Sequence, residues 1–229
     1  MTDALIIGGG PSIESNLKDL HRLGKFPGVV ICTDTSVARM LENKFIDFYA
    51  VTLEDTPDLD KYYKPDVVMK EGHRILGGLV ADRVHNNTKA AMVKADIKPV
   101  NVPECRGYIT SNVGLYCWLV AIHKFKCDRT FLVGMDHCYA SDKRPRIDKN
   151  SSDPAERELY QYAVQELINP YDGETLLLTP EFQLWHEEFL WYTTKFPKIE
   201  VINCSGRGAL YEKSYLWKPI STMKNWSDY

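Results

Sequence analysis

The stretch LIIGGGPSIESNL, residues 5–17, places three glycines and a proline between an apolar run and an amphipathic one. The run at residues 4–7 is short and contains β-branched side chains, which predicts a buried strand. Residues 12–23 repeat apolar side chains at helical spacing and end before Gly24, a residue typical of helix C-termini. The stretch therefore predicts a strand, a glycine turn and a helix in direct succession.

The glycine turn is a candidate phosphate-binding loop. Gly8, Gly9 and Gly10 would let the backbone approach a ligand closely, and a helix that begins near Ser12 would offer N–H groups and a partial positive charge. The turn is not the dinucleotide fingerprint, whose third glycine would fall at Ile13, and no Gly-Lys-Ser/Thr follows to make a P-loop. The alternative is a tight turn that requires glycine and binds nothing.

The composition indicates a protein that works in the cytoplasm. The 229 residues are 44% hydrophobic and 26% charged, which suits a single α/β domain over residues 1–229. A net charge of −3 gives no reason to expect a nucleic-acid partner, and the longest apolar stretch, residues 113–122, is too short to span a membrane. The first residues do not resemble a secretion signal, and the six cysteines form no C-x-x-C pair. A homo-oligomer is compatible with these features.

Strand and helix patterns alternate along the chain. Further strands are predicted at residues 28–34, 47–55, 129–136 and 199–206, with a weaker one at 66–70. Helices are predicted at residues 35–43, at 111–125 with Ser111 or Asn112 as the cap, and at 154–168 and 180–195. The alternation predicts an α/β, three-layer Rossmann-like fold, with a mostly parallel sheet and helices on both faces. The polar residues 140–153 resemble a surface loop or lid.

Polar side chains follow several of the predicted strands. Asp34, Asp55 and Asp136 come directly after three of them, and the carboxyl ends of parallel strands meet at one edge, where ligands bind. Carboxylates at that edge suit a ribose contact and a hydrated Mg²⁺, although each residue also suits a helix cap or a turn. Asp136 is a candidate metal ligand, and His137 beside it is a candidate general base or a surface histidine.

The chain resembles a known family over residues 8–211. The segments GGGPSI, CTDTS, TLED, TSNVGLYCWLVAIHKFKCDRTFLVGMDHCY and VINCSGRGALY occur in the order seen in the archaeal 6-hydroxymethylpterin diphosphokinase (MptE-like) family. That family has a Rossmann-like fold. It is similar to the central domain of flagellin motility accessory proteins and to bacterial sialyltransferases that use CMP-sugars.

The resemblance implies a nucleotide-dependent transferase, with Mg²⁺-dependent transfer of diphosphate from ATP to a pterin hydroxymethyl group as the leading hypothesis. The alternatives are a CMP-sugar glycosyltransferase of the sialyltransferase kind and a non-catalytic nucleotide-binding module. The implied partners are a nucleotide and a small-molecule acceptor. The resemblance and the strand-end pattern together give the predicted site. Its nucleotide-binding residues are Gly8, Gly9, Gly10, Ser12, Asp34, Ser111, Asn112, Asn203, Ser205 and Gly206; its catalytic residues are Asp136 and His137, the latter from the strand-end pattern alone, and its metal ligands are Asp55 and Asp136.

Overall fold

The computed structural model describes residues 2–45, 47–53, 74–77, 99–101, 105, 110, 112–140, 165–169, 173–211 and 215–227. Its elements in chain order are β1 (Asp3–Ile7), α1 (Ile13–Leu23), β2 (Val29–Thr33), α2 (Asp34–Glu42), β3 (Tyr49–Thr52), β4 (Arg74–Gly77), β5 (Pro99–Asn101), α4 (Val113–His123), β6 (Arg129–Val133), β7 (Tyr139–Ala140), β8 (Gln165–Ile168), β9 (Thr175–Leu178), α6 (Pro180–Lys195), β10 (Glu200–Asn203), β11 (Leu216–Trp217) and the 3-10 helix η4 (Ile220–Thr222).

The main sheet confirms the predicted fold class. Eight described strands lie in the order β11-β10-β6-β1-β2-β3-β4-β5, and every neighbouring pair is parallel. The chain runs outward from β1 to β5 on one side of the sheet and then returns to β6, β10 and β11 on the other. The order of strands therefore reverses between β1 and β6, which is where ligands bind in open α/β sheets.

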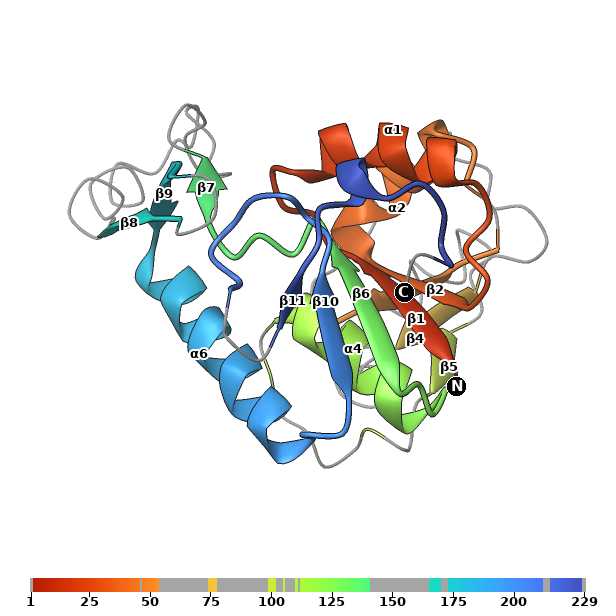
Figure 1. Ribbon diagram of the computed structural model, residues 1–229. Coiled ribbons are helices and arrows are strands. Elements are labelled where there is room, and N and C mark those ends of the chain that lie inside the picture. Colours follow the sequence, from red (N-terminus) through yellow and green to blue (C-terminus); the bar gives the residue numbers. More distant parts are fainter. Residues whose placement is uncertain are drawn as a thin grey trace, which may run out of the picture.

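Helices cover both faces of this sheet (Figure 1). Leu5 and Ile7 of β1 pack with α1, α2 and η4 on one face. Ala4 and Ile6 pack with α4 and part of α6 on the other face. The strand is apolar on both sides because both of its faces are covered, as parallel sheets require.

Four of the predicted helices are present, as α1, α2, α4 and α6. Asn112, and not the alternative Ser111, is the cap of α4, because its side-chain oxygen accepts from the N–H groups of Gly114 and Leu115. The helix is buried almost all round, and α6 packs against it through Trp118 and Phe189. Ser111 itself lies outside the described residues, as do residues 66–70.

A second, three-stranded antiparallel sheet was not predicted from the sequence. It has the order β7-β9-β8, and Figure 1 shows it at one side of the main sheet, above the start of α6. The helix predicted at residues 154–168 is wrong at its end, because residues 165–168 pair with β9 as a strand. The remainder of that segment lies outside the described residues, as do residues 141–153 of the predicted loop. Ala140 belongs to β7.

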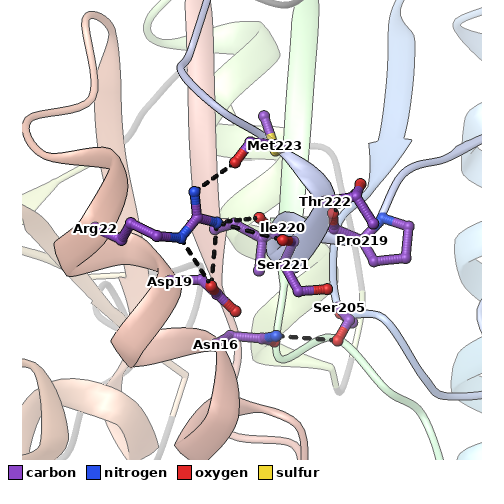
Figure 2. A network of polar contacts seen from close by, with 9 residues as sticks. All are labelled: Asn16, Asp19, Arg22, Ser205, Pro219, Ile220, Ser221, Thr222 and Met223. Carbon is purple, nitrogen blue, oxygen red and sulfur yellow. Dashed lines mark hydrogen bonds and ion pairs between the residues drawn. The ribbon is translucent and has the colours of Figure 1, made fainter.

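Helix α1 is joined to the C-terminal segment by a row of polar contacts (Figure 2). Arg22 donates to the carbonyl oxygens of Ile220 and Met223, and it also pairs with Asp19 at 3.1 Å. Nearer the start of α1, Asn16 donates to the carbonyl oxygen of Ser205 at 3.1 Å. Among the described residues, no helix has the length and apolar character that a membrane span needs.

We predict that Arg22→Ala destabilises the protein by about 1–2 kcal/mol, because carbonyl groups of the C-terminal segment lose a charged donor that is only half exposed. Arg39→Ala is the matched control, since the Arg39 side chain is similarly exposed but forms a single ion pair, with Glu14, whose loss should cost less than about 1 kcal/mol. Urea unfolding measures both. Equal losses in the two variants would show that the Arg22 contacts add nothing specific.

Candidate functional site

The glycine turn packs directly against the end of β6. Gly8 donates to the carbonyl oxygen of Val133 at 2.7 Å, and Gly10 donates to that of Gly134 at 2.8 Å. A Cβ atom at Gly8 would collide with the Gly134 carbonyl group, and one at Gly10 would lie 2.5 Å from a carboxylate oxygen of Asp136. Contacts within the protein therefore require glycine at these two positions. The phosphate-binding role of the turn stays a prediction.

The anion at the N-terminus of α1 is the protein's own Asp136. Its Oδ2 accepts from the Ser12 backbone N–H at 2.7 Å, and its Oδ1 accepts from the Ser12 hydroxyl, also at 2.7 Å. The partial positive charge of the helix terminus favours a carboxylate at this position. The start of α1 thus meets a carboxylate of the protein itself, and the phosphate expected there from the sequence stays a prediction.

Burial sets the charge state of Asp136. The side chain is almost fully buried, and desolvation raises the pKa of its carboxyl to about 6. The two Ser12 hydrogen bonds oppose that rise, with smaller contributions from the Arg207 charge and the Ser205 hydroxyl. Asp136 is therefore a carboxyl that titrates close to neutral pH, which is typical of functional sites.

A loop that follows β10 wraps around Asp136. Asn203 holds the loop by accepting from the Ser205 N–H at 3.0 Å, and Ala209 donates its N–H to the Asp136 carbonyl oxygen at 2.7 Å. Gly206 and Gly208 have φ values of 79° and 111°, a region that favours glycine. The sequence prediction that Asn203, Ser205 and Gly206 lie near the other site residues agrees with this geometry.

A shallow hollow, without room for a water molecule in this structure, lies between the glycine turn and the small sheet. It is lined by Pro11, Asp136, Arg207 and Glu174, among others. Arg207 is an ion-pair partner of Glu174 at 3.0 Å, and its side chain is 39% exposed. The hollow thus combines a buried carboxyl with a cation that solvent can reach.

His137 follows Asp136 directly in the chain, and its side chain contacts Asn112 at the start of α4. Its Nε2 lies 3.2 Å from the Asn112 amide nitrogen, and its ring meets the Phe189 ring edge-on at 5.9 Å. Burial, with a smaller effect from His186, lowers the pKa of His137 to about 3. The backbone of His137 is left-handed, with φ of 49°, which is uncommon for a residue other than glycine.

Asp34 is engaged by protein groups. It begins α2, and its two carboxylate oxygens accept from the Thr35 N–H at 2.6 Å and from the Thr52 hydroxyl at 2.8 Å. A Cβ atom at Gly9 would meet the Thr35 side chain, so the glycine turn and the start of α2 are neighbours. Asp34 therefore shares the sheet edge with the glycine turn. It is the first residue of α2 and not its cap, which is Thr33, so the capping role that the sequence left open is wrong.

The predicted magnesium site stays a prediction, because Asp55, one of its two ligands, lies outside the described residues. Within the part of the chain that the structure describes, no group of three or more metal-binding side chains is found. Asp136 and Asp34 each have both oxygens bonded to protein donors, which a Mg²⁺ ion would have to share or displace.

Sequence reasoning did not select Arg207, Glu174 or Thr52. Arg207 had a usable signal, because it lies between two glycines after the last buried strand. Glu174 had none, because the small sheet that carries it was not predicted. Thr52 bonds to a residue 18 positions away, a relation that no local pattern displays.

Comparison with known proteins gives a likeness of fold. No family model and no curated protein matches the sequence. The structure is similar to that of the MAf glycosyltransferase from Magnetospirillum magneticum AMB-1, with a TM-score of 0.67 and 15% identity. The match covers 97% of this chain and 34% of that one, so this chain spans about a third of its length. The protein therefore has a glycosyltransferase-like α/β fold.

We predict that Asp136→Asn changes the pH dependence of stability. The folded pKa of about 6 exceeds the ordinary value of 3.8, so the native state holds the extra proton between these values. The wild type should therefore lose about 2 kcal/mol relative to the variant as the pH rises from 4 to 7. Urea unfolding across this range measures the difference.

The lowered pKa of His137 acts in the opposite direction, with stability lost as the pH falls below 6.5, but it is present in both proteins and cancels in the difference. A difference between wild type and Asp136→Asn that stays constant with pH, or that changes in the reverse direction, would contradict the raised pKa of Asp136.

Proposed function

We propose that this chain binds a nucleotide sugar and transfers its sugar to a small-molecule acceptor, with a CMP-sugar as the first candidate donor. The observation that carries the proposal is that the buried Asp136 and the partly exposed Arg207 lie close together beyond the ends of β1 and β6, where both line the hollow. The likeness to a glycosyltransferase over nearly the whole chain supports the same class.

The charges at this hollow suit glycosyl transfer. The leaving group of a nucleotide sugar is a phosphate, which needs a cation or hydrogen-bond donors as its bond to the sugar breaks. Arg207 supplies that charge at the rim, and exchanging its Glu174 partner for a phosphate would keep the guanidinium paired. Asp136 fixes the glycine turn on one side of the hollow and stabilises the charge on Arg207.

Transfer of diphosphate from Mg²⁺-ATP to a 6-hydroxymethylpterin-type acceptor is the second candidate. Its support is that Asp34 and Asp136 follow strands that end at the same edge of the sheet. In this reaction Mg²⁺ would neutralise the phosphate charge. The carboxylates would first have to release the protein donors described above.

We predict that CMP or a CMP-sugar raises the melting temperature in the presence of EDTA. At a ligand concentration of 100 times Kd, binding adds about 2.7 kcal/mol, or roughly 5–10 °C for a chain of this size. The panel includes CMP, CMP-sialic acid, UDP- and GDP-sugars, and ATP with and without Mg²⁺. Arg207→Ala should remove most of the shift, and Arg39→Ala should leave it unchanged.

Each result of the panel separates the candidates. Stabilisation by ATP only when Mg²⁺ is present would replace the glycosyltransferase proposal with the diphosphokinase. Binding of a nucleotide sugar without its hydrolysis or transfer would indicate a non-catalytic module. Absence of a shift with every nucleotide would refute both enzyme proposals.

A further inference from the structure

The orientation of the Asn112 side chain is fixed by the helix that it caps. Its Oδ1 accepts from the N–H groups of Gly114 at 2.8 Å and Leu115 at 3.2 Å. The amide nitrogen therefore points the other way, toward His137 Nε2 at 3.2 Å. Reversing the amide would break the cap, so Asn112 acts as a hydrogen-bond donor to His137.

This contact selects one form of the imidazole ring. A nitrogen that accepts a hydrogen bond carries no proton, so Nε2 of His137 is the acceptor and Nδ1 holds the hydrogen of the neutral ring. Nδ1 is therefore a donor. The sequence predicts a general base at His137; acting as a base through Nδ1 would require the opposite tautomer.

The Nδ1–H donor of His137 has no partner in the described part of the structure. The atom is shielded from solvent, and the residue as a whole is 6% exposed. Buried donors are almost always paired, and the residue also has the left-handed backbone noted above. Both features mark functional positions more often than ordinary core positions.

We propose that His137 acts as a neutral hydrogen-bond donor through Nδ1–H to an oxygen atom of the bound nucleotide sugar, and that Asn112 is the positioning residue that holds it in this form. The choice of ligand rests on the proposed function. The tautomer rests only on the contacts of Asn112. A phosphate oxygen and a sugar oxygen share the required chemistry, and the experiment below distinguishes them.

NMR correlation of the ring nitrogens with their protons tests the tautomer in the ligand-free protein. We expect the proton on Nδ1 of His137, and a proton on Nε2 would overturn the inference. Addition of CMP should move the Nδ1–H resonance if the acceptor is a phosphate oxygen, whereas a shift with CMP-sialic acid alone would indicate a sugar oxygen. Binding of both ligands with no movement of this resonance would refute the donor role.

Two substitutions of His137 distinguish the role of Nδ1 from that of Nε2. His137→Asn keeps an N–H donor near the position of Nδ1 and tolerates a left-handed backbone, whereas His137→Gln keeps a polar group near Nε2 and loses the Nδ1 donor. We expect the Asn variant to bind CMP-sialic acid within about threefold of wild type and the Gln variant to bind about tenfold more weakly. The reverse order would overturn the proposal.

Failure of this inference and failure of the proposed function give different results. If none of the nucleotides binds, the proposed function and the substrate part of the inference both fail, while the ligand-free spectrum still decides the tautomer. If nucleotides bind but His137→Gln binds as well as wild type, the proposed function stands and the donor role is refuted. Melting temperatures of the ligand-free variants show whether a loss of binding reflects a loss of fold.

Discussion

The pair of hydrogen bonds between Ser12 and the Asp136 carboxylate is the contact on which the rest of the site depends. It joins the start of α1 to the end of β6 across the point where the strand order reverses. The glycine turn must then lie flat against β6, and side chains are excluded from it. The loop after β10 closes over the same carboxylate. A negative charge at a helix N-terminus is favourable, which offsets part of the cost of burying it.

The dipeptide Asp136–His137 connects the two helical layers. Asp136 bonds to α1 on one face of the sheet, whereas His137 bonds to Asn112 at the start of α4 on the other. The left-handed backbone of His137 accompanies this change of direction. The end of β6 therefore positions both the Asp136 carboxyl and the buried His137 imidazole. A ligand that binds at the switch point would contact protein groups whose orientation is already fixed.

Sequence patterns were sufficient for the main sheet and its helices, because buried parallel strands and amphipathic helices have strong periodic signals. They failed for β8 and β9, which have four residues each and pair across a short turn, so residues 165–168 were taken for the end of a helix. The edge that gathers Asp34 and Asp136 was also predictable from strand ends. The hydrogen-bond partners of these carboxylates were not predictable. Ser12 and Asp136 are 124 positions apart in the sequence. A carboxylate that bonds to a helix terminus of the same protein also has the same local sequence as one that binds a ligand.

A double-mutant cycle between Ser12 and Asp136 tests this contact most directly. Unfolding free energies of Ser12→Ala, Asp136→Ala and the double variant are measured at pH 7.5, where the carboxyl is ionised. A buried hydrogen bond to a charged group predicts that the two changes are coupled by about 1.5–3 kcal/mol. Additive effects, within about 0.5 kcal/mol, would show that the Ser12 hydroxyl does not hold Asp136 at the helix terminus.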